Sequence, residues 1–485
     1  MAPSDRQDAK YFTDLQNGIV GWEGMNDPKN PKNYANPRKW FLLSLVSLVA
    51  LVSPFGSSVF APGASTAAEE FHETSHILTT LSVSCYVLGY AVGPMFLSSL
   101  SELYGRRIIL NVATCVFVLF QIGCALAPNI SALIVFRTIA GMGGSACLTI
   151  GGGVVSDLFE PEQRGLAMSV FSFGPLFGPV IGPICGGFIV EGAGWRWIFW
   201  TLAIAGGTFT TFVMIFNRET NPTILIHRKT KRLQRELNRP DLRSCYDAAK
   251  STDSSKGRFI LRKLSMPLRL LFSSPIISII ALYISIIYGC LYLLFTTITG
   301  VFQQTYHWSI EISSLSYIGV GLGFVIGQIV FALTSDRIVV RLKSRNNNVF
   351  EPEMRLPYCI FFAVCVPISF FWYGWSVQAR THWIVPIIGL FPFGFGTVGI
   401  FGNLQTYLVD SYPMYAASAI AALTTCRSLF GALLPLAGPY MYEALGYGWG
   451  NSLLGFVTLA AIPMPLIFYR FGRTLRERAV IERKS

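Results

Sequence analysis

The sequence predicts an all-α polytopic membrane protein with twelve transmembrane helices in two pseudo-symmetric halves of six. Composition is the first observation behind this prediction. Hydrophobic residues make up 52% of the 485 residues and charged residues only 13%, against about 25% charged residues in a soluble globular protein. The mean hydropathy of +0.49 agrees. A soluble protein with so few charges could not cover its own surface, and disordered and collagen-like chains are excluded by the same composition.

Twelve stretches are long and apolar enough to cross a bilayer, because a hydrocarbon core of ~30 Å requires about 20 helical residues. In chain order they cover residues 40–63, 77–101, 108–127, 131–156, 166–190, 197–217, 275–301, 313–335, 356–376, 383–409, 413–440 and 450–470. Short breaks rich in Pro, Gly and Asn separate several of them. The first 39 residues are polar and include no cleavable apolar segment, which favours a cytoplasmic tail over a signal peptide.

The distribution of Lys and Arg predicts how these helices are oriented. If the N-terminus lies in the cytoplasm, 34 of the 38 basic residues fall in cytoplasmic segments, and only Arg196 and Arg380 fall in external loops. The positive-inside rule therefore places both termini in the cytoplasm. Contact between basic residues and anionic membrane lipids also accounts for the net charge of +12, so this charge does not indicate nucleic-acid binding.

Five segments follow from this layout. We predict a cytoplasmic tail at 1–39, a first six-helix half at 40–217, a basic cytoplasmic linker at 218–273, a second six-helix half at 274–470 and a cytoplasmic tail at 471–485. The linker holds 14 basic and five acidic residues. We expect it to lie on the inner leaflet with one helix around 225–238, and a regulatory or partner-binding role is the alternative.

Charged residues recur at equivalent places in the two halves, which indicates a duplication. In each half a glycine precedes an acidic residue by nine positions, arginines follow, and a second acidic residue ends the fourth helix of the half. The two sets are Gly93, Glu102, Arg106, Arg107 and Asp157, and Gly327, Asp336, Arg337, Arg341 and Asp410. Many transporters are built from two such halves, related by an axis along the membrane normal.

The short inner loop after the second helix is the most informative motif. Glu102 and Arg106 can pair with Asp157 and Arg164, which lie on the inner side of the fourth and fifth helices. Ion pairs that form when one side closes and break when it opens can bias a two-state equilibrium. The predicted inner gate comprises Glu102, Arg106, Arg107, Arg164, Asp336 and Arg337. A static surface ion pair, which stabilises little, is the alternative.

The fifth helix carries a ladder of Gly-Pro pairs. Its members are Gly174, Pro175, Gly178, Pro179, Gly182, Pro183, Gly186 and Gly187. Glycines at every fourth position share one helix face and allow a neighbouring helix to approach closely. The prolines remove backbone hydrogen bonds and allow bending. We interpret the ladder as a bendable interface, with simple tight packing as the alternative.

Two arginines lie inside predicted spans, where a charge is costly and usually faces a cavity or a partner. At ~1.5 Å per residue, Arg137 and Arg427 both reach the outer half of a shared cavity. Bonding to backbone carbonyls is the alternative. Aromatic and neutral polar residues are predicted to complete the substrate cavity with Arg427: Tyr86, Tyr90, Tyr288, Tyr292, Gln328, Asn403 and Tyr407. No carboxylate lies mid-span, so a polyamine would enter this cavity unpaired, and we expect neutral or weakly acidic substrates.

Sites of other chemical classes are absent from the sequence. The ten cysteines form no CxxC pair, the five histidines show no metal spacing, and no GxxxxGK[ST] phosphate loop occurs. The GxGxxG match at Gly394–Gly399 lies within an apolar span, so it indicates helix packing rather than a dinucleotide site. We therefore expect no metal, no cofactor and no self-contained ATP-driven pump.

Together these residues resemble the major facilitator superfamily, specifically the fungal twelve-span drug:proton antiporters. Leu100-Ser-Glu-Leu-Tyr-Gly-Arg-Arg107 is similar to the family's inner-loop motif. Arg137 with Gly141 and Gly144 is similar to its fourth-helix motif, and the Gly-Pro ladder to its fifth-helix antiporter motif. Further similar stretches begin at Trp22, Pro352, Tyr373, Tyr407 and Arg427. Among the departures, Glu102 stands in place of the usual aspartate, Ser99 where proline is common, and Arg218 where proline is favoured.

The resemblance implies the superfamily fold and transport by alternating access, powered by the proton gradient. It implies that Arg137 takes part in proton coupling, and we assign Asp157 to the same task. We predict a monomeric exporter of neutral or weakly acidic organic compounds in the plasma membrane, or alternatively in a vacuolar or vesicle membrane. A proton-coupled uptake symporter and a polyamine exporter are the alternatives within transport. A membrane-embedded enzyme would need a catalytic constellation, and a receptor of this shape tends to have long signalling tails; the sequence has neither.

Overall fold

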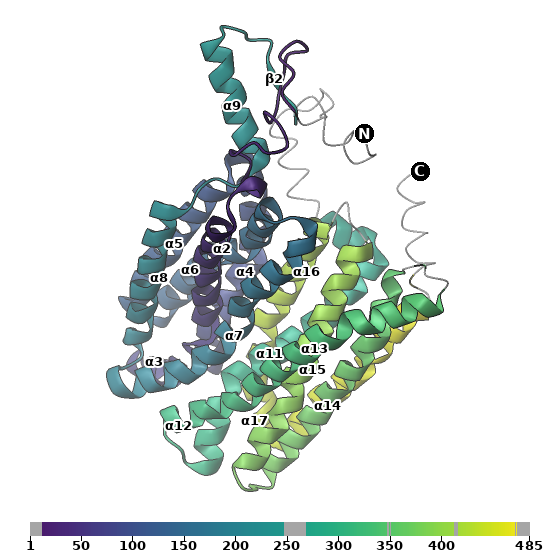
Figure 1. The fold of residues 1–485 in the computed structure, drawn as a ribbon. Coiled ribbons are helices and arrows are strands. Elements are labelled where there is room, and N and C mark those ends of the chain that lie inside the picture. The colour runs from purple at the N-terminus through teal and green to yellow at the C-terminus, as the bar shows by residue number, and fades with distance from the viewer. Residues whose placement is uncertain are drawn as a thin grey trace.

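A computed structural model describes residues 12–246, 268–346, 349, 351–411, 416–470 and 472, without the side chains of 161, 162, 164, 165, 169, 336 and 416–418. Long helices dominate it (Figure 1). The first half contains α2 (Asn36–Ser58), α3 (Ala64–Glu70), α4 (His76–Tyr104), α5 (Arg106–Ala125), α6 (Ile130–Leu158), α7 (Pro161–Ala193) and α8 (Arg196–Phe216). The second contains α11 (Pro275–Tyr306), α12 (Ile310–Ser314), α13 (Ile318–Arg345), α14 (Leu356–Gln378), α15 (Ile384–Ser411), α16 (Ala416–Leu433) and α17 (Gly438–Ala461). Short 3-10 turns adjoin several helices: η2 (Pro31–Asn33), η3 (Ala61–Gly63), η4 (Leu315–Tyr317), η5 (Pro352–Arg355) and η7 (Leu434–Ala437).

The described residues contain eleven helical runs that are long and apolar enough to cross a membrane. One of them, Ala419–Arg470, has 52 residues and would extend about 78 Å if straight, more than twice a hydrocarbon core. Gly446 interrupts α17 with a non-helical backbone (φ 69°, ψ 177°), so the chain turns there. That run therefore supplies two crossings, and the predicted total of twelve is confirmed.

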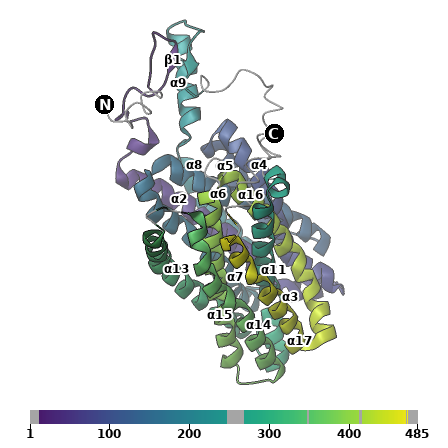
Figure 2. The ribbon, with the colours of Figure 1, turned by 90° about the vertical axis from the view of Figure 1, so that its right-hand side faces the viewer.

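The two halves repeat the same helix pairing. In the first half α2 packs on α7, α6 lies between α4 and α5, and α8 packs on α5. In the second half α11 packs on α16, α15 lies between α13 and α14, and α17 packs on α14. The halves occupy separate regions of the bundle, coloured purple to teal and green to yellow (Figures 1 and 2). The pairing agrees with the predicted pseudo-symmetric pair of six-helix halves.

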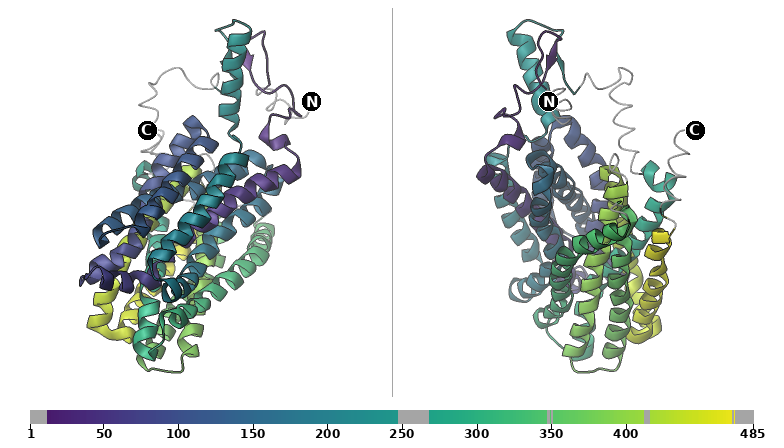
Figure 3. Two further views of the ribbon diagram at one scale, coloured as in Figure 1. Left: turned by 90° about the vertical axis from the view of Figure 1, so that its left-hand side faces the viewer. Right: turned by 45° about the vertical axis from the view of Figure 1, so that its right-hand side comes forward.

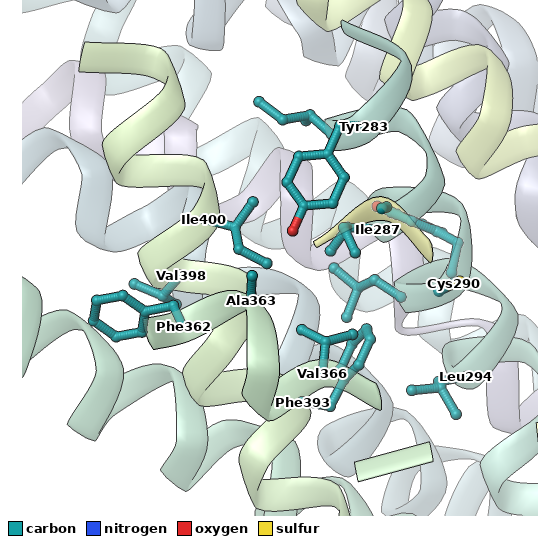
Figure 4. Packing of buried hydrophobic residues seen from close by; sticks show 14 of the residues in the cluster. Tyr283, Ile287, Cys290, Leu294, Phe362, Ala363, Val366, Phe393, Val398 and Ile400 are labelled. Carbon is teal, nitrogen blue, oxygen red and sulfur yellow. The ribbon is translucent and has the colours of Figure 1, made fainter. Parts of the chain in front are cut away.

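Apolar side chains serve two purposes in this bundle. Leu119, Ile204 and Ile215 on α5 and α8 are more than 60% exposed, as expected for residues that face lipid. In the second half α11, α14 and α15 bury a continuous apolar core. Figure 4 shows Ile287 and Cys290 of α11 facing Val366 of α14 and Phe393 of α15.

We name the two ends of the bundle the α9 side, after α9 (Pro222–Glu236), and the α3 side, after α3. Described contacts between the halves lie midway and toward the α3 side. The Tyr292 hydroxyl of α11 donates to Ser57 Oγ of α2 (2.8 Å), and the Thr425 hydroxyl of α16 donates to the Ala91 carbonyl of α4 (3.1 Å). α7 packs on α12 at the α3 side.

A small extension stands off the bundle at the α9 side. Helix α9 (Pro222–Glu236) projects away from the membrane helices in every view (Figures 1 and 3). The N-terminal strand β1 (Ile19–Val20) pairs in parallel with β2 (Arg243–Ser244), which follows α9. Trp22 packs against Ile226 of α9, which is fully buried. A hydrogen bond from Arg239 lowers the pKa of the exposed Asp241 carboxyl beside β2.

The expectation that this helix lies on the membrane surface is therefore wrong for α9. A linker helix would lie on lipid if its apolar face needed cover. Here the N-terminal segment covers that face, and Lys229 ties the two together through the Gly21 carbonyl (2.9 Å) and Glu23 (3.2 Å). Most of the remaining linker, 247–267, lies outside the described residues.

Candidate functional site

A group of hydroxyls and aromatic rings, hereafter the central cluster, lies where α2, α4, α11, α15 and α16 meet. Its members are Ser53 and Ser57 of α2, Tyr86 and Tyr90 of α4, Tyr288 and Tyr292 of α11, Phe401 of α15 and Arg427 of α16. On the first-half side, Ser53 Oγ lies 2.6 Å from the Tyr90 hydroxyl and 3.0 Å from the Tyr86 hydroxyl. This approach requires Gly144 in α6, because a Cβ there would be 2.2 Å from Ser53 Oγ.

The second half contributes the charge of the central cluster. The guanidinium carbon of Arg427 lies 5.0 Å from the Tyr288 ring centre and 5.9 Å from that of Phe401. Tyr288 also packs on Tyr292, with ring centres 5.0 Å apart, and Tyr292 reaches Ser57 of the other half. Arg427 is half-buried, and its Nε is buried without a hydrogen-bond partner among the described residues.

Arg137 lies elsewhere, and its predicted position in a shared cavity is wrong. The side chain is 1% exposed and enclosed within the first half. Its Nη2 donates to the backbone carbonyls of Val83 (3.3 Å), Ser57 (3.4 Å) and Gly56 (3.5 Å). Three aromatic rings surround it, the nearest that of Phe60 at 4.9 Å. Sequence depth alone could not show that α2, α4 and α8 close around this helix face.

The guanidinium of Arg137 is incompletely satisfied. Its Nε and Nη1 are buried and have no hydrogen-bond partner in the described part of the chain. The bonds to carbonyls are long, at 3.3–3.5 Å, so they are weak. The alternative of carbonyl bonding is thus present, but it uses only one of the three nitrogens. A buried cation with unused donors can respond strongly to a change of charge or protonation nearby.

Three other predicted cavity residues lie outside the central cluster. Gln328 is half-buried on α13. Asn403 is buried and donates to the Gly399 carbonyl of its own helix (2.8 Å). Tyr407 lies near the α9 end of α15, beside Glu353 and Gly472, so its assignment to the central cavity is wrong. Both helices, α13 and α15, extend about 40 Å at 1.5 Å per residue. Residues on the same face of one helix can therefore lie at very different depths.

The predicted contact between the inner loop and α6 is present at the α9 side. Arg106 Nε lies 3.2 Å from Asp157 Oδ2, and both side chains are largely buried. The Thr220 hydroxyl donates to the same carboxylate oxygen (3.3 Å). Arg107 donates instead to the Met214 carbonyl (3.1 Å). All these residues belong to the first half or its junction with the linker, so the pair joins helices within one half.

The other predicted gate residues lie on α4, α7 and α13. Glu102 is half-buried at the end of α4, and Arg337 is exposed on α13. The side chains of Arg164 and Asp336 lie outside the described residues. No described ion pair bridges the two halves at this side. Whether these residues act as a gate stays a prediction.

Glu219 is a site residue that the motif analysis missed. Its carboxylate is buried under the start of α5, where it accepts hydrogen bonds from the backbone N–H groups of Arg106 (2.9 Å) and Arg107 (3.4 Å). A carboxylate at a helix N-terminus is stabilised by unpaired N–H groups and by the helix dipole. Gly105 (φ 105°) allows the approach, because a Cβ there would be 2.1 Å from Glu219 Oε2. The Glu-Thr pair after the sixth span was the available signal.

Arg355 is the second missed residue. It pairs with Asp410 (2.6 Å) at the α9 side, where Arg355 precedes α14 and Asp410 nearly ends α15. Arg106 and Asp157 occupy the same places on α5 and α6. The sequence repeat suggests Arg337 as the counterpart of Arg106, whereas the structure gives this pairing to Arg355. From the sequence, the stretch beginning at Pro352 is identified only by its similarity to a family signature.

The glycines of the fifth-helix ladder face α2 of the same half. Cβ atoms at Gly174, Gly178 and Gly186 would lie 2.8, 2.8 and 2.0 Å from backbone atoms of α2 or the residue after it. Only Gly187 faces the other half, where Ser314 of α12 is its nearest neighbour. Helix α7 continues through all three prolines. Tight packing of α7 on α2 is therefore shown, and bending stays a prediction.

Metal chemistry has no support in the described residues, where no three His, Cys, Asp or Glu side chains gather. The central cluster instead brings hydroxyl groups, aromatic rings and the Arg427 guanidinium together at the junction of the halves. Two described hydrogen bonds join the halves near the central cluster, one from Tyr292 to Ser57 and one from Thr425 to the Ala91 carbonyl. A ligand bound between these contacts would therefore act on both halves.

Comparisons with known proteins agree with this architecture. The family description that matches residues 46–435 is the Major Facilitator Superfamily. The chain is 45% identical over 457 residues to "MFS transporter cpaT" of Aspergillus oryzae, covering 94% of this chain and 91% of that protein. It is 46% identical over 458 residues to "MFS-type transporter penM" of Penicillium rubens, covering 94% and 89%.

Solved structures show the same fold at low identity. The structure titled "Partially occluded inward open conformation of the xylose transporter XylE from E. coli" superposes with a TM-score of 0.65 at 17% identity, covering 90% of this chain and 98% of that one. "Crystal structure of D-xylose-proton symporter" gives 0.65 at 17% identity, covering 88% and 97%. With twelve crossings, two repeated halves and a family match over most of its length, this chain is a membrane transporter of the Major Facilitator Superfamily.

Proposed function

We propose that this transporter exports small neutral or weakly acidic organic compounds, such as secondary metabolites, toxins or fungicides, in exchange for protons. The central cluster is the observation that carries the proposal. It offers hydroxyl groups, aromatic faces and the positive charge of Arg427 at the junction of the halves. Neutral and acidic amphiphiles match such a surface, whereas a polyamine would lose its hydration without meeting an anion.

Transport by alternating access would use both halves of the molecule. We place the α9 side in the cytoplasm, because most basic residues lie in segments at that side. In this orientation the described contacts between the halves close the external side. The membrane is the plasma membrane in this proposal, with a vacuolar or vesicle membrane as the alternative, and the working unit is a monomer.

The proton gradient is the proposed energy source, with no cofactor. We assign proton coupling to Arg137 and Asp157, and gating of the cytoplasmic side to the predicted inner gate. Two observations support these assignments. The carboxylate of Asp157 would lose its charge, and with it the pairing to Arg106, on taking up a proton, and the guanidinium of Arg137 has two nitrogens without a partner in the described residues.

Expression in a pump-deficient yeast tests the direction and the substrate class together. We expect resistance to a panel of neutral and acidic toxins, and efflux of the protective compounds that stops when the proton gradient is collapsed. The transporter should give no protection against spermidine. Strong protection against spermidine alone would support the polyamine exporter, and increased accumulation with the same gradient dependence would support the uptake symporter. The empty vector and an expressed Arg137→Ala variant are the controls.

A further inference from the structure

Arg427 occupies a distinctive position in the fold. It lies eleven residues into α16, about 17 Å from the helix start and far from either end of the bundle. α16 packs on α11 of its own half and on α4 of the other half. Thr425, two residues earlier, donates to the Ala91 carbonyl across that junction. A ligand at Arg427 would thus lie within reach of both halves.

Among the described residues, no acidic side chain neutralises the charge of Arg427. In the part of the chain that the structure describes, Arg427 takes part in no ion pair. Its Nε is buried and unused. The aromatic rings of Tyr288 and Phe401 stabilise the cation through their faces, yet they carry no net charge. An uncompensated charge in a membrane is costly, so this guanidinium would be stabilised by an anion.

The geometry also specifies the shape of the anion. A guanidinium binds planar, delocalised anions through two parallel N–H donors, which an ammonium cannot do. The Tyr288 and Phe401 rings lie 6.1 Å apart, with an angle of 36° between their planes, so the guanidinium is flanked by aromatic carbon that a conjugated ring beside the anion would contact. The Tyr292 hydroxyl is part of the same packed group.

We infer that Arg427, Tyr288 and Phe401 form a subsite for a carboxylate or acidic enolate conjugated to a planar ring. The inference rests on the proposed function and narrows its substrate class. Arg137 does not fit this role, because its side chain is enclosed within the first half, whereas Arg427 keeps part of its surface exposed.

Ligand-induced thermal stabilisation of the purified full-length protein tests the subsite directly. The probes are 2-naphthoate, its neutral isostere 2-naphthamide and the cation 2-naphthylmethylammonium. We expect 2-naphthoate to raise the apparent Tm more than the other two, because a ligand that binds only the folded state stabilises it. Arg427→Gln should weaken naphthoate binding on the order of tenfold to a hundredfold, as expected for lost charge-assisted hydrogen bonds, and leave naphthamide binding within about twofold.

Two further variants keep the experiment decisive. Arg427→Lys retains the charge and should fold even if the glutamine variant does not, and we expect it to lose most of the preference for the acid. Arg380→Gln makes the same charge change at an exposed turn and should bind as the wild type does. Equal binding of acid and amide to the wild type, no binding of the acid, or an acid preference that survives both Arg427 variants would overturn the subsite.

Failure of the proposed function would look different. In proteoliposomes with an imposed pH gradient, naphthoate that binds through Arg427 but is not moved by the gradient would leave the subsite in place and remove proton exchange. Gradient-driven movement of neutral compounds with no preference for the acid would support proton exchange and overturn the subsite.

Discussion

Replacing Gly105 with alanine should destabilise the α9 side of the first half through two separable effects. Gly105 has φ 105° and ψ 154°, a region used almost only by glycine, and forcing another residue into it costs about 1–3 kcal/mol. The new Cβ would also lie 2.1 Å from Glu219 Oε2, so the carboxylate must move. Moving it breaks the 2.9 Å bond from the Arg106 N–H, a charge-assisted hydrogen bond that contributes about 1.5–3 kcal/mol.

Gly194 provides a matched control for the backbone effect. It has φ 91° and ψ 161°, and a Cβ there would meet nothing within 4 Å. Gly194→Ala should therefore lose only the conformational part, about 1–3 kcal/mol. The two alanine variants should differ by about 1.5–3 kcal/mol, the contribution of Glu219.

Thermal unfolding in detergent, followed by intrinsic fluorescence, measures this difference. At about 2 °C per kcal/mol, the apparent Tm of Gly105→Ala should fall roughly 3–6 °C below that of Gly194→Ala. In a Glu219→Ala background the two variants should unfold at the same temperature, because the bond is already absent. Equal Tm values in the wild-type background, or a difference that survives removal of Glu219, would refute the assigned role of this contact.

Three further predictions concern the transport cycle. Asp157→Asn should increase cysteine labelling of the cytoplasmic side at unchanged expression, because it weakens the pair with Arg106; unchanged labelling would remove this pair from the gate. Arg137→Ala should abolish gradient-driven efflux more than equilibrium substrate binding, and equal loss of both would indicate a structural role. Tyr292→Phe should raise amide hydrogen exchange in 59–64 and 310–317, since it removes a bond between the halves that contributes about 0.5–1.5 kcal/mol, whereas Tyr288→Phe should not.

Much of this molecule follows from properties that are local in sequence. The spans are predictable because lipid requires about 20 consecutive apolar residues, and this requirement depends on no distant partner. The contact between Arg106 and Asp157 is predictable too, since short loops fix which helix ends lie on the same side. The repeated motifs located the two halves for the same reason.

The partners of individual polar groups could not be predicted in this way. Glu219 reaches its partner Arg106 across 113 positions in sequence, and Tyr292 reaches Ser57 across 235. A depth estimate places Arg137 and Arg427 at similar levels, yet one is enclosed by helices of its own half and the other lies at the junction. The direction in which each helix face points depends on which helices pack around it.

Helix α9 shows the same division. Its helical character and its basic residues were predictable from the sequence, but its place away from the membrane was not. The sequence contains both an apolar face and a segment able to cover it, Trp22 with β1, separated by about 200 residues. The pattern of apolar residues predicts only that this face is covered. Lipid and protein both remove an apolar face from water, so only the tertiary structure decides which of them covers it.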